Sequence, residues 1–252
     1  MPSPTMPRAL LALLLLLAAC AARAGEVQVA AAANLGPAIQ KIAAAFARDT
    51  GHRAVVALGS TGKFHAQIVH GAPFEVLLAA DEDTPRRLEA EGHGVPRSRF
   101  TYAIGRLVLW SPQEGTVDRR GDVLRQPPRG RLALADPRLA PYGAAAIAVL
   151  KKMGVHAAWQ PHIVMGESVG QAYQFVASGN ASLGFVALSQ VAEDGRIVRG
   201  SGWVVPGNLY PPIRQDALLL KPGAGNAAAQ AFLQYMRGNA ARAILRRAGY
   251  AV

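Results

Sequence analysis

Cysteine is almost absent from this chain: Cys20 is the only one among 252 residues, so no disulfide framework holds the fold together. Hydrophobic residues make up 51% of the chain, enough for a large core without disulfides. Clustered metal ligands are missing as well. His65 and His70 are five residues apart, off a common helix face, and Tyr173 and Tyr210 stand alone. A ferric-iron site is therefore not expected.

Acidic and aromatic residues are also scarce. The chain has 16 Asp and Glu against 27 Lys and Arg, a formal net charge of +11, and aromatic residues make up 6%. Strong basicity raises the question of nucleic-acid binding. The arginines are scattered, however, and no aromatic stacking platform lies among them. We predict no nucleic-acid partner, and a solvated basic surface that attracts anionic ligands or an acidic docking partner.

Long hydrophobic runs are confined to the N-terminus. Residues 9–19 form an apolar stretch behind Arg8 that is too short to span a membrane. Ala22-Arg23-Ala24 then fits the small-x-small pattern of a cleavage site. We therefore predict a signal peptide over residues 1–24, with Gly25 as the mature N-terminus. The sequence indicates an exported protein.

The same segment allows a second interpretation. Leu17-Ala18-Ala19-Cys20 looks like a bacterial lipobox, which would make Cys20 a lipid-carrying N-terminus. Against this, the first predicted strand begins near Glu26 and leaves almost no tether. We prefer cleavage after Ala24, with a lipid anchor through Cys20 as the alternative.

The stretch Gly59-Ser60-Thr61-Gly62-Lys63 reads as a strand-to-helix turn with two glycines and two hydroxyls. It is not a P-loop, because Ala57 and Phe64 stand where that motif requires Gly and Ser or Thr. A helix start still offers unpaired N–H groups and the positive end of the helix dipole, which together attract anions. Taken alone, the stretch favours an ordinary solvated turn before a surface helix.

A Gly-x-Ser-x-Gly sequence, the pattern of a hydrolase nucleophile elbow, occurs once, at Gly166-Glu167-Ser168-Val169-Gly170. Ser60 lacks this context, and Ser168 would also need a His–acid pair, for which the sequence gives no signal. We predict no catalytic residues and no enzymatic activity.

Alternating strand and helix patterns predict an α/β fold. The apolar run at residues 27–33 is followed by Asn34 and Pro37, which are typical of a helix start at the end of a strand. Polar side chains at the carboxyl ends of strands are where open α/β sheets bind ligands. Similar strand–helix units recur along the chain and point to sheets with helices on both faces.

These units predict two similar Rossmann-like lobes joined by two crossover segments, near Gly105 and Val205. We assign residues 25–104 plus 206–252 to the first lobe and residues 105–205 to the second. Two lobes connected in this way can hinge around a ligand.

Several motifs recur in order and in register in a known family: Ala31-Ala32-Ala33-Asn34-Leu35, Gly59-Ser60-Thr61-Gly62-Lys63-Phe64, Gly71-Ala72-Pro73, Leu134-Ala135-Asp136-Pro137, Pro141-Tyr142-Gly143, Glu167-Ser168-Val169 and Gly184-Phe185-Val186-Ala187. With them the chain resembles the periplasmic molybdate-binding proteins of ABC-type molybdate importers. The resemblance implies a type II periplasmic binding fold and a hinged cleft. It also implies a monomer in the periplasm that needs no cofactor and serves a membrane permease and its ATPase.

The resemblance further implies how molybdate or tungstate is held: through its oxygens, by neutral hydrogen-bond donors, with no side chain bonded to molybdenum. Carried over to this chain, the contacts are Asn34, a hydroxyl of Thr61 or its neighbour Ser60, Tyr142, and the backbone N–H of Val169.

One position departs from the family pattern. Many members have a ligand-binding tyrosine where this chain has Ala187. Our hypothesis is that the hydroxyl of Tyr142 supplies the missing donor.

The alternative function is a receptor for another oxyanion, such as sulfate, thiosulfate or phosphate. A phosphate site would need an acceptor for the ligand's proton, and Asp81 or Asp136 at strand ends could serve. Their simpler role is helix capping.

Overall fold

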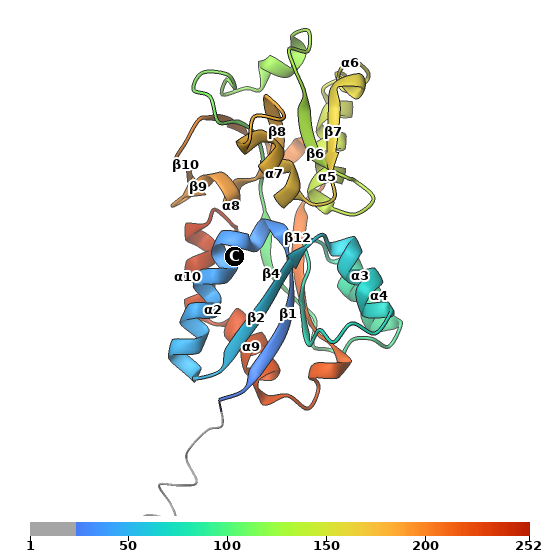
Figure 1. Ribbon diagram of the computed structural model, residues 1–252, viewed down its shortest axis with the longest axis vertical. Helices are drawn as coiled ribbons and strands as arrows, with labels where there is room; N and C mark the ends of the chain where they lie inside the picture. Colours follow the sequence, from blue (N-terminus) through green and yellow to red (C-terminus); the bar gives the residue numbers. More distant parts are fainter. Residues whose placement is uncertain (1–23) are drawn as a thin grey trace, which may run out of the picture.

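The computed structural model describes residues 24–252, which form two lobes, each built on a five-stranded sheet (Figure 1). Cys20 and the predicted signal peptide up to residue 23 lie outside the described residues. Within residues 24–252, no helix has both the length and the apolar character that a membrane span needs.

The first lobe is the lower one in Figure 1 and contains both ends of the described chain. Its strands are β1 (Glu26–Ala32), β2 (Arg53–Gly59), β3 (Val76–Leu78), β4 (Phe100–Gly105) and β12 (Ile213–Leu219), in the order β2-β1-β3-β12-β4. Its helices are α2 (Gly36–Thr50), α3 (Thr61–Val69), α4 (Asp83–Ala90), α9 (Ala227–Arg237) and α10 (Asn239–Arg247).

Alternation along β1 places apolar residues on both faces of this sheet. Val27 and Val29 pack in one core with Ile42 of α2, whereas Ala30 packs in another with Phe64 of α3. Both faces are therefore covered by helices, as the repeated strand–helix pattern predicted.

The second lobe has the strand order β11-β5-β8-β6-β7. These strands are β5 (Leu107–Ser111), β6 (Leu132–Ala135), β7 (Ile163–Gly166), β8 (Leu183–Ala187) and β11 (Ser201–Val204). Its helices are α5 (Pro141–Lys152), α6 (His156–Trp159), α7 (Val169–Ala177) and α8 (Leu188–Val191), followed by a hairpin of β9 (Ala192–Glu193) and β10 (Arg196–Ile197).

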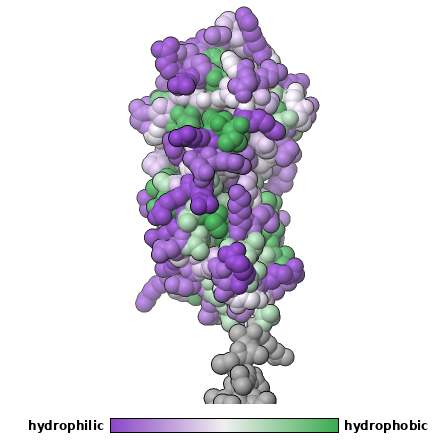
Figure 2. Space-filling view, turned by 90° about the vertical axis from the view of Figure 1, so that its left-hand side faces the viewer, coloured by the Kyte–Doolittle hydropathy of each residue, from purple (hydrophilic) through white to green (hydrophobic). Residues whose placement is uncertain are grey.

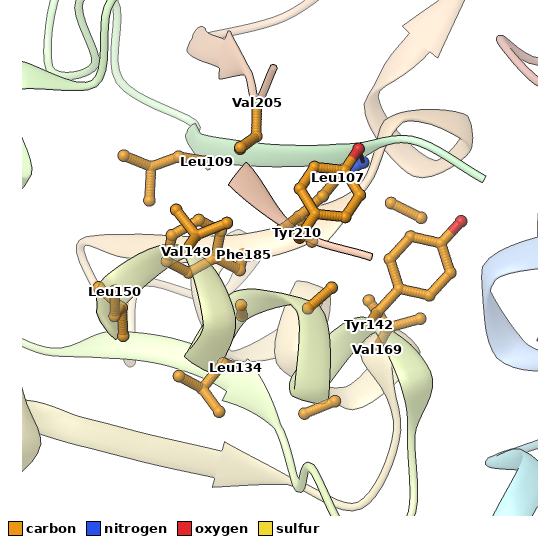
Figure 3. Packing of buried hydrophobic residues seen from close by; sticks show 14 of the residues in the cluster. Leu107, Leu109, Leu134, Tyr142, Val149, Leu150, Val169, Phe185, Val205 and Tyr210 are labelled. Atoms are coloured by element: carbon orange, nitrogen blue, oxygen red, sulfur yellow. Dashed lines mark hydrogen bonds between the residues drawn. The ribbon is translucent and has the colours of Figure 1, made fainter. Parts of the chain in front are cut away.

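Helix α5 anchors the core of the second lobe. Val149 and Leu150 of α5 belong to the same buried cluster as Leu109 and Phe185 from the sheet. Tyr142, in the first turn of this helix, lies beside Val169 at the edge of the cluster (Figure 3). The packing of α5 therefore fixes the position of its N-terminus.

Each sheet is mixed rather than wholly parallel. In the first lobe β12 is antiparallel to both β3 and β4, and in the second lobe β5 is antiparallel to both β8 and β11. The reason is that β5 and β12 each follow directly on a passage between the lobes and enter their sheets from the opposite end. The two-lobe α/β fold that the sequence predicted is confirmed.

The chain passes between the lobes twice. It leaves the first sheet at Gly105 and enters the second at Leu107, and it returns through residues 205–212. A Cβ atom on Gly105 would lie 2.1 Å from the Tyr142 hydroxyl and 2.5 Å from Nε2 of Gln215, so the first passage requires glycine. These passages occur near Gly105 and Val205, and the lobe boundaries assigned from the sequence stay predictions.

Candidate functional site

A small cavity lies where the lobes meet, at the carboxyl ends of β1 and β2, which point toward the second lobe in Figure 1. It holds about 10 Å³, roughly the space of one water molecule. Pockets for organic ligands usually hold roughly 300–1,000 Å³. The residues that line it are Ala32, Ala33, Asn34, Gly59, Ser60, Thr61, Ala80, Ala140, Pro141, Tyr142, Ser168 and Val169. None of these side chains carries a formal charge, so the cavity suits a small ligand held by hydrogen bonds.

Two hydroxyls at the start of α3 have protons available for a ligand. Ser60 is the N-cap, and its Oγ accepts a hydrogen bond from the N–H of Lys63 at 3.4 Å. Thr61 Oγ1 accepts from the N–H of Ala80 at 3.0 Å. Both side chains are buried, and neither hydroxyl donates to an acceptor within residues 24–252. Each oxygen is thus fixed by a backbone donor while its own O–H remains free to donate.

The starts of α5 and α7 supply backbone donors. Pro141 opens α5 without an N–H, and the N–H groups of Gly143 and Ala144 both bond to the carbonyl of Ala140. Tyr142 N–H therefore has no acceptor in the described part of the chain. At α7 the Oγ of the N-cap Ser168 accepts from Gln171 N–H at 3.2 Å, which leaves Val169 N–H without a partner there. These are the orphan donors that every helix start presents.

Asn34 belongs to a buried polar network. Its Nδ2 donates to Gln215 Oε1 at 2.9 Å and to Tyr250 Oη at 2.8 Å. Gln215 Oε1 also accepts from Tyr102 Oη at 3.0 Å, and Gln215 Nε2 donates to Tyr142 Oη at 3.1 Å. Gln215 therefore joins Asn34 of the first lobe to Tyr142 of the second.

The backbone of Asn34 is bonded to residues of both lobes. Its carbonyl accepts from Ser189 Oγ of α8 at 2.8 Å and from Tyr250 Oη at 2.9 Å. Gln215 and Tyr250 take both protons of Asn34 Nδ2, so the side chain has no spare donor. Its Oδ1, which can only accept, has no partner within residues 24–252. The N–H of Asn34, in the 3₁₀ turn Ala33–Leu35, is the donor that remains for a ligand.

Burial keeps the tyrosines of this network neutral. It raises the pKa of Tyr250 to about 12 and raises the pKa of Tyr102 and of Tyr142 well above the usual value for tyrosine. Their hydroxyls therefore stay protonated at neutral pH and remain able to donate. The network carries no formal charge toward the cavity.

Asp81 and Asp136 are engaged elsewhere. Asp81 accepts from the N–H of Thr84 at 2.8 Å, near the start of α4, and burial raises its pKa. Hydrogen bonds from Arg138 lower the pKa of Asp136, whose carboxylate accepts from the Arg138 N–H at 2.9 Å. Neither carboxylate lines the cavity. Asp81 contacts the first turn of α4, as its expected capping role implies, whereas Asp136 bonds to Arg138 in the turn before α5 and caps no helix, so that role is wrong for Asp136.

Five of the residues predicted from the sequence come together around this cavity: Asn34, Ser60, Thr61, Tyr142 and Val169. Ala187 is not among the lining residues; it is buried at the end of β8, where its N–H donates to Gln190 Oε1 at 2.9 Å. Whether these residues contact a ligand stays a prediction.

Sequence reasoning missed two residues: one that lines the cavity and one that bonds to two of the lining residues. Ser168 lines the cavity, and the signal for it was present, because a serine directly before Val169 is a favoured N-cap. Gln215 carried no comparable signal. It lies inside a strand, and its partners are 73 to 181 residues away in the sequence.

A larger groove lies on the other side of the lobe junction. It holds about 650 Å³ between α2 and α10 of the first lobe and the β9–β10 hairpin of the second. Lys41, Arg199 and Arg247 line it together with Glu193 and Asp194. Figure 2 shows this side of the molecule, where hydrophobic residues are interspersed with hydrophilic ones. Because charges of both signs line the groove, it is less suited to a bare anion than the small uncharged cavity.

Comparison with known proteins gives concordant results. Residues 27–251 match the family model of the bacterial extracellular solute-binding proteins. The chain is 54% identical over 234 residues to the molybdate-binding protein ModA of Azotobacter vinelandii, covering 93% of each chain. It is 50% identical over 230 residues to ModA of Rhodobacter capsulatus, covering 91% of this chain and 89% of that protein.

Two solved structures illustrate the fold. The periplasmic molybdate-binding protein of Azotobacter vinelandii matches with a TM-score of 0.86 at 44% identity, over 90% of this chain and 99% of that one. The sulfate-binding protein SubI of Mycobacterium tuberculosis matches with a TM-score of 0.71 at 14% identity, over 90% of this chain and 86% of that one. At that identity the second match concerns the fold alone.

Replacing Gln215 by leucine tests the network. Gln215→Leu removes the only partner that the Tyr142 hydroxyl has within residues 24–252, together with one acceptor of Asn34 Nδ2. Leaving such buried groups unpaired costs about 1–3 kcal/mol. We expect the free energy of unfolding in urea to fall by that amount. Gln40→Leu, on the exposed face of α2, is the matched control with little expected change. Equal stability of the two variants would contradict the role of the network.

The raised pKa of Tyr250 predicts a loss of stability in alkali. The folded chain releases this proton near pH 12, whereas the unfolded chain releases it at about pH 10. The protonated Tyr250 hydroxyl therefore contributes up to about 3 kcal/mol to the free energy of unfolding. This contribution is complete below pH 10 and is lost as the pH rises toward 12. Urea unfolding at increasing pH should show this fall in the wild type and a shallower one in Tyr250→Phe. Identical slopes would contradict the assignment.

Proposed function

The chain belongs to the molybdate-binding members of the bacterial extracellular solute-binding protein family, and on that premise we propose that it captures molybdate between its lobes. Tungstate, the same size and charge class of oxyanion, is the second expected ligand. The observation that carries the proposal is the convergence of unpaired donors from both lobes on one small uncharged cavity.

The donor set fits a tetrahedral dianion. Such an ion offers only oxygen acceptors, and the cavity offers the N–H groups of Asn34, Tyr142 and Val169 with the hydroxyls of Ser60 and Thr61. Helix starts stabilise negative charge without a cationic side chain. Hydrogen bonds to a charged partner contribute roughly 1.5–3 kcal/mol each. Several of them support sub-micromolar binding, at about −8 kcal/mol or better.

These residues would hold the oxyanion through its oxygens, and no side chain would bond to molybdenum. The hydroxyl of Tyr142 is proposed as the donor that stands in for the tyrosine missing at Ala187. It accepts from Gln215 Nε2, and its own proton has no acceptor within residues 24–252. Ser168 is a further candidate, because its Oγ accepts from Gln171 N–H and its proton is likewise unused there.

A receptor for sulfate, thiosulfate or phosphate is the alternative, and it is not favoured. The relatives of highest identity described above are molybdate-binding proteins. A phosphate site would also need an acceptor for the ligand's proton, and the carboxylates of Asp81 and Asp136 do not line the cavity.

Delivery requires a membrane partner. We propose that the loaded protein docks on an ABC permease driven by its ATPase, that it acts as a monomer, and that it needs no cofactor and catalyses no reaction. The family places it outside the cytoplasm. Periplasmic release after cleavage at Ala24 is the proposed route, with lipid anchoring through Cys20 as the alternative.

Titration with four oxyanions tests the proposal. The protein from Gly25 onward is heated with molybdate, tungstate, sulfate or phosphate at matched ionic strength. A ligand at one hundred times its dissociation constant stabilises the folded state by about 2.7 kcal/mol. We expect this effect with molybdate and tungstate and none with sulfate. Stabilisation by sulfate or phosphate alone would be compatible with the fold but would contradict molybdate as the ligand.

Removing the Tyr142 hydroxyl tests its proposed contact. Tyr142→Phe should weaken molybdate binding about ten- to a hundredfold, the loss of one hydrogen bond to a charged ligand. Affinity is measured by calorimetry, and stability without ligand is measured separately because Gln215 also loses a partner. Tyr235→Phe, on the outer surface of the first lobe, is the control. Lower stability with unchanged affinity would show that the hydroxyl serves the network alone.

A further inference from the structure

A single ion pair joins the two lobes within residues 24–252. Lys63 Nζ, in the first turn of α3, pairs with Glu167 Oε2, in the turn that leads into α7. Each of the other ion pairs in that part of the chain connects residues of one lobe. The two side chains are 45% and 63% exposed, so the pair lies at the rim of the cleft rather than inside it.

The pair adjoins two of the helix starts that supply donors to the cavity. Lys63 follows Thr61 by two positions, and Glu167 precedes Val169 by two. Beside it, the N–H of Gly62 donates to the carbonyl of Leu139 in the second lobe at 2.9 Å. A Cβ atom at Gly62 would lie 3.1 Å from the Leu139 backbone, so the lobes touch closely at this edge.

We propose that Lys63 and Glu167 form a latch for the captured anion, an inference that rests on the proposed function. When the lobes separate, Glu167 moves away with the second lobe. Lys63 is then an unpaired cation at the mouth of an otherwise uncharged site. It attracts a dianion over about one Debye length, roughly 8 Å at physiological salt.

Closure changes the role of the lysine. Once Glu167 pairs with it, the positive charge is neutralised by the protein itself, and the anion is held by the neutral donors described above. The new pair links the lobes and opposes reopening. Exposed pairs are weak, so the expected effect on release is about two- to fivefold.

The two partners leave different kinetic signatures. Glu167→Gln removes the latch but keeps the attracting cation, so release should become about two- to fivefold faster with no loss in association rate. Lys63→Met removes both, so release should accelerate similarly while association slows, mainly at low salt. The exchange Lys63→Glu with Glu167→Lys should restore slow release.

The experiment measures retention of radiolabelled molybdate after a chase with excess unlabelled molybdate, at low and physiological ionic strength. Calorimetry supplies the dissociation constant, and the two together give the association rate. Arg53→Met is the matched control, because it removes one positive charge and one exposed ion pair at the far end of β2. The latch is overturned if Glu167→Gln and Arg53→Met release molybdate at the wild-type rate.

Failure of the proposed function would look different. In that case the wild type itself would retain no molybdate. The ion pair is then tested without ligand, by a double-mutant cycle of Lys63→Met and Glu167→Gln on thermal unfolding at low salt. A coupling within error of zero would overturn the latch, and a favourable coupling that salt abolishes would support a cross-lobe bond.

Discussion

Unpaired N–H groups at helix starts are the constraint around which this molecule is built. A helix cannot satisfy its first amides internally, and those of α5 and α7 converge on one cavity with the hydroxyls at the start of α3, from two separate sheets. Each start is held in place by its own core: α5 through Val149 and Leu150, and α3 through Phe64 and Ile68. The same packing that stabilises each lobe therefore aims the donors, and the site exists only when the lobes lie together.

Neutrality of the site follows from the same arrangement. Carboxylates near strand ends are tied to local partners, as Asp136 is to Arg138, and the tyrosines behind the cavity are kept protonated by burial. Charged side chains such as Lys63 and Glu167 lie at the rim, where water screens them. A dianion thus meets donors inside and charges only at the entrance. This separation lets binding strength and entry rate be set by different residues.

Much of this could be read from the sequence, because helix and strand ends are local features. Asn34 before Pro37 and Ser60-Thr61 after an apolar run are start signals that need no tertiary information, and they led to residues that share the cavity. Gln215 could not be found in this way. Its importance comes from Asn34, Tyr102 and Tyr142, which three different elements bring to it. Ala187 differs from Gln215, because attention was drawn to it by the family resemblance alone. The fold buries Ala187 beside Gln190.

The position of β12 has a consequence for how the chain folds as it is made. This strand, residues 213–219, lies between β3 and β4 in the first sheet, so that sheet has a gap until the end of the chain is available. The sheet of the second lobe uses only residues 107–204 and can form earlier. Contacts between distant parts of a sequence form slowly. The lobe that begins the chain is thus the last to be completed, because its sheet cannot be finished before residues 213–219 are available.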